Sequence, residues 1–280
     1  MSYQQMCFPG FKRKALTFSY DDDVIFNKRL IEIFNKNGLK ATFNINGGQF
    51  PKTDEDWLIS EPTMVALLKN SKHEIANHGW KHESLSEVDS AAGINDIIED
   101  RKHWEKVFGR IVKGYAYPCG TFAMDERSAQ LAKDCGINYA RTTTSTYGFD
   151  IPTDWLKLDP TCHSRDPRFP ELCKTFVESS ADDMPMMFYV WGHAYEFKLD
   201  DNWSLIEELA AYLGNRKDVW YATNGEIFDY VQAYDRLEYS VDKTRVFNPT
   251  CFDVYLRPFG CELTIAKAGK TTKIKKRKQV

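Results

Sequence analysis

The amino-acid sequence predicts an α/β fold in which a mostly parallel sheet carries a small β appendage at its C-terminal end. Short apolar runs alternate with stretches of helical spacing between residues 15 and 234, and this alternation is typical of strand–helix–strand units. After residue 238 the pattern changes to short β-like runs separated by turn signals. We therefore expect a main domain over residues 1–238, a β extension over 239–272 and a disordered basic tail over 273–280.

Length and composition are compatible with one sizeable core. The chain has 280 residues, of which 42% are hydrophobic and 14% aromatic, as in compact globular proteins. The formal net charge of −3 gives no reason to expect nucleic acid or a membrane as a partner. No stretch approaches the roughly 20 apolar residues that span a bilayer. The sequence leaves the oligomeric state open.

The N-terminus and the cysteines bear on the cellular compartment. Residues 1–14 lack the apolar region of a secretory signal. We therefore expect a cytoplasmic protein, although a secreted protein trimmed of its signal would look the same. The seven cysteines have scattered spacings, which predicts reduced and mostly buried thiols.

The first half of the chain alternates between strands and helices. The apolar run 15–18, bounded by charged residues, predicts a short buried strand. Residues 24–37 place apolar side chains at helical spacing and end in Asn37-Gly38, a helix stop signal. The same reasoning predicts strand 41–45, helix 62–71, a strand end at 75–76 and a long helix over 90–108 that closes at Gly109.

The second half continues the alternation after one irregular segment. Residues 115–117 predict a strand before a Pro118 loop, and helix 125–135 is stopped by Gly136. Residues 143–180 are rich in Pro, Asp and Thr, which predicts loops over the strand ends. The remaining predicted elements are strands 139–142, 187–192 and 219–222, helices 205–213 and 225–234, and β-like runs 246–247, 252–256 and 261–265.

Three carboxylates follow the first predicted strand, at Asp21, Asp22 and Asp23. Like charges this close resist joint ionisation. A divalent metal would resolve the conflict, because one carboxylate could bind it while its neighbour stays free as a base. Runs of aspartate more often form solvated loops. This stretch alone therefore does not show whether the protein binds a metal.

Two histidines strengthen the metal hypothesis. His78 and His82 are four residues apart, a spacing that puts both rings on one face of a helical turn. Together with Asp22 they would form a set of one carboxylate and two imidazoles. Such a set leaves positions for water and substrate, as a catalytic zinc site does. Two surface or capping histidines are the alternative.

Four motifs in sequence order resemble the polysaccharide deacetylases, a family of metal-dependent carbohydrate esterases with NodB homology (carbohydrate esterase family 4-like). They are Ser19-Tyr20-Asp21-Asp22, the pair His78 and His82, the loop 116–120, and a strand that delivers His193. The matches run from about residue 15 to 195. The resemblance implies a distorted, seven-stranded (β/α) barrel with the site at the C-terminal ends of the strands.

The resemblance also implies an activity, the removal of acetyl groups from N-acetylated or O-acetylated carbohydrate by hydrolysis. In that family's mechanism a divalent metal, most often zinc, would be held by Asp22, His78 and His82. Asp21 would be the general base and His193 would protonate the leaving amine. The Pro118 loop would offer an oxyanion N–H, through Cys119. Trp155 and Trp191 could offer stacking faces for a sugar ring.

The sequence departs from the family at several positions. Ala116 stands where the family has an arginine that orients the base, and Arg141 or Arg165 could replace it through space. Asp23 stands where glycine is usual, and we expect it either to tighten the metal or to point to solvent. The family's Asp-and-Trp motif is met only loosely by Asp154-Trp155, and His163 is the reserve histidine.

Two other functions remain open at this point. The missing arginine is compatible with a carbohydrate-binding relative without turnover. The missing signal peptide mildly favours a small soluble substrate, so hydrolysis of a small non-sugar amide is the second alternative.

Overall fold

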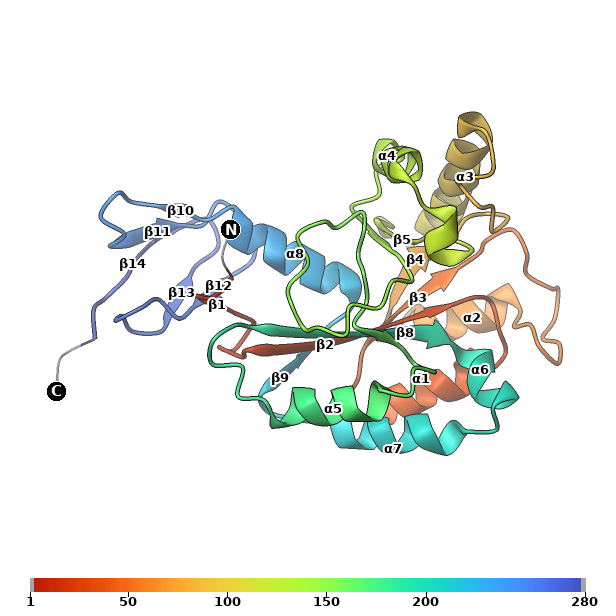
Figure 1. Cartoon of the computed structure of the whole chain (residues 1–280). Coiled ribbons are helices and arrows are strands. Elements are labelled where there is room, and N and C mark those ends of the chain that lie inside the picture. The colour runs from red at the N-terminus through yellow and green to blue at the C-terminus, as the bar shows by residue number, and fades with distance from the viewer. Residues whose placement is uncertain (1–2, 278–280) are drawn as a thin grey trace.

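A curled parallel sheet forms the centre of the molecule (Figure 1). The computed structural model describes residues 3–277. The strands of this sheet are β2 (Lys14–Asp21), β3 (Ala41–Ile45), β4 (Glu74–Asn77), β5 (Gly114–Ala116), β6 (Tyr139–Arg141), β7 (Cys162–His163), β8 (Met186–His193) and β9 (Val219–Tyr221). Their order is β6-β5-β4-β3-β2-β8-β7, with β9 paired to β2.

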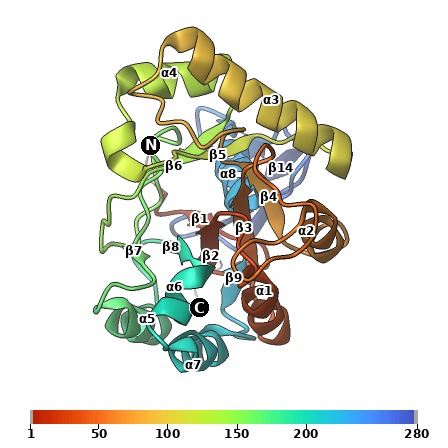
Figure 2. The same ribbon diagram turned by 90° about the vertical axis from the view of Figure 1, so that its right-hand side faces the viewer.

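Helices pack around the outside of the curled sheet, which forms a half-barrel when viewed from its end (Figure 2). They are α1 (Asn27–Lys36), α2 (Glu61–Leu68), α3 (Ser90–Phe108), α4 (Glu126–Asp134), α5 (Phe169–Glu178), α6 (Ala194–Leu199), α7 (Trp203–Leu213) and α8 (Asn224–Asp235), besides a short 3₁₀ helix, Gly120–Ala123. The predicted distorted (β/α) barrel is confirmed. The described sheet has eight strands rather than the predicted seven.

Strand β2 organises the sheet because it lies between β3 and β8. All eight of its residues are buried, and it is parallel to both neighbours. The register pairs Asp21 with Asn44 on β3 and with His193 on β8. The polar residues at the C-terminal ends of three central strands therefore meet at one point.

One irregular segment spans the gap between the edge strands β6 and β7. The Leu158 N–H donates to Ala140 of β6 at 2.9 Å, and the Thr161 N–H donates to Tyr189 of β8 at 2.8 Å. Residues 155–163 therefore touch both sides of the half-barrel. The expectation of loops throughout 143–180 was partly wrong, because this range contains β7 and α5.

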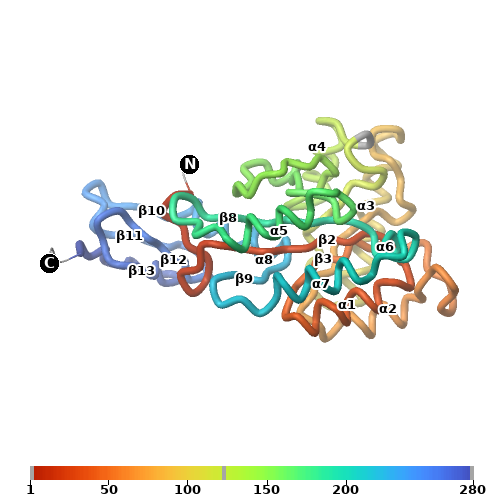
Figure 3. The backbone as a smooth tube through the Cα atoms, turned by 60° about the horizontal axis from the view of Figure 1, so that its bottom comes forward, coloured from red at the N-terminus to blue at the C-terminus, as the bar shows by residue number. Residues whose placement is uncertain are grey.

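The C-terminal appendage consists of two small antiparallel sheets (Figure 3). Their strands are β1 (Met6–Cys7), β12 (Val254–Leu256) and β13 (Thr264–Ala266) in one sheet, and β10 (Glu238–Tyr239), β11 (Arg245–Phe247) and β14 (Thr271–Lys273) in the other. The prediction of a disordered tail was wrong for 273–277, which is held by β14 and a bridge from Lys276 to Cys261. Residues 278–280 lie outside the described residues.

The appendage shares a hydrophobic core with the barrel. Val246, Leu256 and Ile274 pack in one cluster with Tyr230 of α8 and Met187 of β8. This continuous apolar contact fixes the appendage against the barrel. No helix in residues 3–277 is both long and apolar enough to cross a bilayer.

Helix α3 shows how sequence signals set an element. Asp89 caps its first turn by accepting from the Ala92 N–H at 2.9 Å, and Gly109 ends it in a left-handed conformation, φ 67°. Its Trp104 is fully buried and donates from Nε1 to the Ile45 carbonyl at 3.1 Å. The helix is thereby fixed against β3.

We predict that Trp104→Ala lowers the free energy of unfolding by about 3–5 kcal/mol, because it leaves a large cavity and an unpaired carbonyl. Denaturant unfolding measures the change. Ile111→Ala is the control, since Ile111 is 76% exposed and its loss should change stability by less than about 0.5 kcal/mol. Equal effects of the two substitutions would contradict this account of the core.

Candidate active site

Two adjacent carboxylates leave the end of β2 in different directions. Asp21 is the last residue of the strand and is buried, with 3% of its surface exposed. Asp22 has a left-handed backbone, with φ 73°, which costs a non-glycine residue energy. Both carboxylates approach His78 and His193, but Asp22 is partly exposed and can bind a ligand, whereas Asp21 stays inside the barrel.

The histidine loop after β4 is held from behind by two carboxylates of α3. Asp100 accepts from the backbone N–H groups of His78 at 3.2 Å and Gly47 at 2.6 Å. Asp96 accepts from the Lys81 N–H at 2.7 Å. These buried acceptors fix the loop backbone and so position both histidine rings.

Asp22, His78 and His82 come together as a group able to hold a metal ion. Their candidate ligand atoms all lie within 4.8 Å of one another. His78 Nε2 and His82 Nε2 lie 3.7 Å and 3.8 Å from Asp22 Oδ1. The predicted set of one carboxylate and two imidazoles is therefore assembled in space.

The protonation of His78 suits a metal ligand. Burial lowers its pKa, against the opposing effect of Asp21 and Asp22, so the ring is neutral at pH 7. Its Nδ1 lies 2.9 Å from the Ala116 carbonyl, an acceptor that fixes the proton on Nδ1. The Nε2 lone pair is thus free and faces Asp22, an arrangement common to metal-binding histidines.

Arg141 replaces the missing family arginine in binding Asp21. Its Nη2 donates to Asp21 Oδ2, and Asn44 donates to Oδ1 of the same carboxylate at 2.7 Å. Burial alone would raise the pKa of Asp21, but Arg141, His78 and His193 outweigh it and lower the pKa. Asp21 is therefore ionised. Arg165, the other candidate, pairs instead with Asp200 at 2.6 Å.

His193 lies on the other side of Asp21 and is held by Glu196. Its Nε2 is 3.8 Å from Asp21 Oδ2, and its Nδ1 is 3.2 Å from Glu196 Oε1. Burial lowers the pKa of His193, but the bond to Glu196 and the charge of Asp21 outweigh it and raise the pKa. The sequence analysis did not identify Glu196, although its position three residues after His193, at the start of a helix, was a usable signal.

His163, His193 and Glu196 also lie within metal-binding range of one another, but their protons do not fit a metal. His163 Nδ1 accepts from the Arg165 N–H at 3.0 Å. The proton of neutral His163 is therefore on Nε2, which donates to Glu196 Oε2 at 3.3 Å. His163 supports Glu196, whose pKa is lowered to about 2 because the two histidines outweigh its burial.

Asp23 differs from both expectations. It lies outside the metal group and is not directed to solvent, since only 6% of it is exposed. Burial, together with the charges of Asp22 and Asp100, raises its pKa well above the usual value. Asp23 is therefore a buried acid behind the site.

The Pro118 loop reaches the site, whereas only one of the two predicted tryptophans lies near it. Cys119 is exposed and has φ 61°, and its pKa is raised by partial burial and then by the charges of Glu87 and Asp22. Trp191 lies under the Arg141 guanidinium, and the centre of its ring is 4.3 Å from the guanidinium carbon. Trp155 packs against Phe228 in the core, so its predicted contact with a sugar is wrong.

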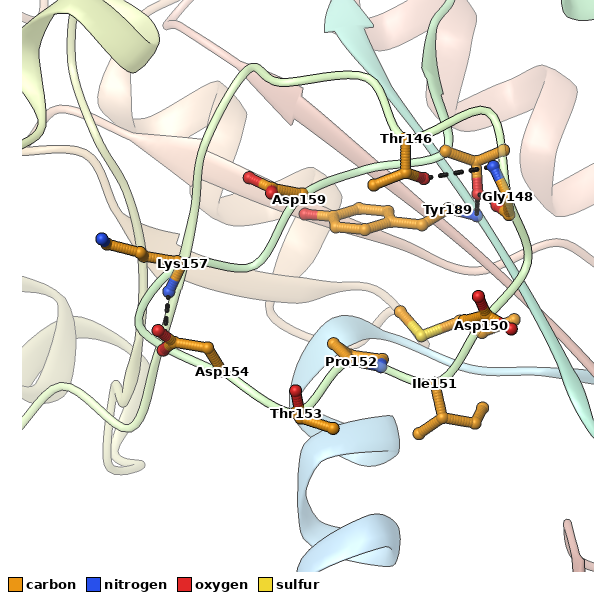
Figure 4. Close-up of a pocket in the computed structure, with 12 residues that line it drawn as sticks. Thr146, Gly148, Asp150, Ile151, Pro152, Thr153, Asp154, Lys157, Asp159 and Tyr189 are labelled. Carbon is orange, nitrogen blue, oxygen red and sulfur yellow. Dashed lines mark hydrogen bonds between the residues drawn. The ribbon is translucent and has the colours of Figure 1, made fainter. Parts of the chain in front are cut away.

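Asp154 faces a separate cavity of about 410 Å³, between the loop 146–159 and β8 (Figure 4). Asp159, Lys157 and Tyr189 also line it. None of its lining residues belongs to the metal group. Asp154 of the loosely matched Asp-and-Trp motif therefore lies apart from the metal group.

A family model described as polysaccharide deacetylase matches residues 9–140. Over this stretch the chain is similar to the polysaccharide deacetylases. The matched stretch holds Asp21, Asp22, His78 and His82, so the resemblance read from these motifs is confirmed. Arg141 and His193 lie outside the matched stretch. The fold brings them next to Asp21.

The relatives of this deacetylase-like chain match it over limited stretches. A chitin deacetylase from Pestalotiopsis sp. is 25% identical over 99 residues, 35% of this chain and 30% of that protein. The chain thus matches about a third of that relative's length.

Solved structures extend the likeness at the level of the fold. A Mycobacterium smegmatis structure that carries the polysaccharide deacetylase name has a TM-score of 0.60 at 17% identity, covering 84% of this chain and 96% of that one. PuuE allantoinase also has a TM-score of 0.60, at 13% identity, covering 79% and 91%. Proteins named for different activities share this fold, so the fold alone does not identify a substrate.

We predict that Asp22→Ala removes measurable zinc binding, because it deletes the carboxylate of the metal group, whereas Asp21→Asn keeps binding near the wild-type affinity. Isothermal titration of the metal-free protein with zinc measures both. Asp21→Asn is the matched control because it alters the adjacent carboxylate without touching the group. Binding by Asp22→Ala at wild-type affinity would exclude Asp22 as a ligand.

Proposed function

We propose that this chain is a zinc-dependent deacetylase that hydrolyses N-acetyl groups of a carbohydrate. One observation carries the proposal. Asp21 is an ionised carboxylate outside the metal group, 3.9 Å from His78 Nε2 and 3.8 Å from His193 Nε2. A base, a metal group and an acid thus meet at the end of β2. The family match and a relative named chitin deacetylase support the acetylated sugar as substrate.

The residues present fit a zinc ion. Asp22 Oδ1, His78 Nε2 and His82 Nε2 are the three protein donors of a catalytic zinc site with open positions. An ion bound there would polarise the acetyl carbonyl and lower the pKa of water. The left-handed turn at Asp22 and the carbonyl of Ala116 keep these donors facing one point.

Asp21 acts as the general base. Arg141 keeps it ionised, and Asn44 holds its second oxygen, so the carboxylate has one fixed orientation toward the metal group. As the oxygen of water attacks the acetyl carbon, Asp21 takes the proton that water loses. Burial excludes competing solvent from this carboxylate.

His193 acts as the general acid. Glu196 holds its Nδ1–H, so the Nε2–H of the protonated ring faces the reacting group. When the carbon–nitrogen bond breaks, this proton passes to the leaving amine, and acetate and a free amino sugar result. The Cys119 N–H lies on the adjacent loop and is the candidate donor to the oxygen that gains negative charge.

Acetate release tests the proposal. We expect the zinc-loaded protein to release acetate from chitin oligomers, peptidoglycan fragments or acetylated xylan, the last through an ester. Asp21→Asn should lower turnover roughly 100- to 10,000-fold, the usual contribution of a general base, while zinc stays bound.

Three outcomes would contradict parts of this mechanism. Full turnover by Asp21→Asn would exclude Asp21 as the base. Sugar binding without acetate release would identify a non-catalytic relative, and release from small non-sugar amides alone would identify the other alternative substrate class.

The pH profile tests the role of Glu196. Because Glu196 raises the pKa of His193, and the acid works only when protonated, activity falls as pH rises through this pKa. We predict that Glu196→Gln moves this basic limb of the kcat profile to lower pH. Glu207→Gln, which alters an exposed pair with Arg29, should leave the limb unchanged. An unmoved limb in Glu196→Gln would assign the proton to another group.

A further inference from the structure

The charges of this chain are segregated between its two parts. Residues 238–280 contain ten lysines and arginines but four acidic residues, whereas residues 1–237 contain 27 basic and 36 acidic residues. The formal net charge of −3 conceals this division. The C-terminal appendage is therefore a cationic body attached to an anionic barrel.

The basic run at the end of the described chain is folded onto the appendage. Ile274 is buried, with 8% exposed, so its neighbours Lys273 and Lys275 point outward. The Glu262 N–H donates to the Lys275 carbonyl at 2.8 Å, and the Arg277 N–H donates to the Gly260 carbonyl at 3.0 Å. The fold thus holds these cations in place at the surface.

The outer face of the β10–β11–β14 sheet places like charges together. Arg245 lies directly opposite Lys273 in the antiparallel register, an arrangement that destabilises a sheet when nothing compensates it. Within residues 3–277, no carboxylate lies within ion-pair distance of Arg245, Lys273 or Lys275. The nearby Asp242 accepts hydrogen bonds from Ser240 and Thr244, and its charge interacts with Arg245 beyond ion-pair distance.

Exposed apolar side chains lie beside these cations. Val241, at the tip of the β10–β11 hairpin, is fully exposed, and Phe259 and Leu263 are 66% and 49% exposed. Phe259 lines one hollow with Arg257 and Arg277, where Asp182 pairs with Arg257 at 3.2 Å, and another with Lys243. The surface therefore combines fixed positive charge with unburied apolar area.

We propose that this surface, formed by Arg245, Lys273, Lys275, Arg277, Val241, Phe259 and Leu263, docks on an anionic lipid membrane. Cations at such a surface are attracted by acidic headgroups, and apolar side chains beside them enter the headgroup region. A partner that offers only negative charge would leave the exposed apolar side chains of this surface in contact with water. The sequence analysis expected no membrane partner because it considered only the net charge of the whole chain. The basic appendage and the acidic barrel largely cancel in that sum.

The location of the surface is compatible with docking. It lies at the far end of the molecule from the end of β2, where the metal group is found (Figures 1 and 3). A membrane at the appendage leaves the candidate active site open to solvent.

Vesicle co-sedimentation of the full chain tests the proposal. We expect binding to phosphatidylcholine vesicles that contain phosphatidylglycerol, little binding to phosphatidylcholine alone, and release at high salt, where charges are screened. Lys273→Gln with Lys275→Gln should weaken binding roughly 30-fold, since each cation near the surface contributes severalfold. Phe259→Ser should weaken it further.

A double variant on the barrel, Lys69→Gln with Lys133→Gln, removes the same charge from exposed sites elsewhere and should bind as the wild type does. Equal binding to neutral vesicles, or unchanged binding by the appendage double variant, would overturn the proposal. Binding to soluble polyphosphate but not to vesicles would overturn it in favour of an ionic polymer. Comparing anionic vesicles, neutral vesicles and polyphosphate with the wild-type protein needs no variant and separates these outcomes even if a substitution fails to fold.

Discussion

The buried ion pair between Arg141 and Asp21 is the interaction on which the candidate site depends. An ionised carboxylate inside a barrel is costly, by several kcal/mol, unless a cation and hydrogen-bond donors compensate it. Arg141 comes from β6, 120 residues along the chain from Asp21, and is itself 1% exposed. Trp191 lies beneath its guanidinium and Nη1 donates to the Thr142 carbonyl, whereas Nε has no hydrogen-bond partner among the described residues. The sheet must therefore curl, and the segment 155–163 must close the side of the half-barrel, before Asp21 can be both ionised and shielded from water.

Local patterns predicted the parts of the site that lie at strand ends. Asp21, Asp22, His78 and His193 each follow a strand whose apolar run is plain in the sequence, and parallel strands bring their C-terminal ends to one edge. The helix predicted over 90–108 coincides with α3 because Asp89 and Gly109 cap it unambiguously. Signals of this kind depend on residues within a few positions of one another, which is why they can be read without a structure.

The remaining features depend on contacts between distant segments. The sequence analysis could not choose between Arg141 and Arg165 as the replacement for the missing arginine, because no local pattern shows which guanidinium reaches the end of β2. Strand β7 has two residues, too few to show a period, and α5 begins within a segment whose composition indicates loops. Asp23 was misjudged because its surroundings come from segments that are distant in the sequence, the Ile59 N–H that donates to its carbonyl and the Asn46 backbone that hydrogen-bonds its side chain. The ordered basic run was missed because its one inward side chain, Ile274, finds its partners only after the appendage folds onto the barrel.

The left-handed residues of the site have a consequence for how this protein can change. Asp22, His82 and Cys119 have φ between 59° and 73°, conformations that glycine would adopt without penalty. Glycine at Asp22 or His82 would relieve the backbone while deleting a side chain of the metal group, whereas glycine at Cys119 would keep the backbone N–H. Selection for thermal robustness and selection for chemistry therefore act in opposite directions at Asp22 and His82. Stabilised variants obtained without an activity screen should accumulate losses there first.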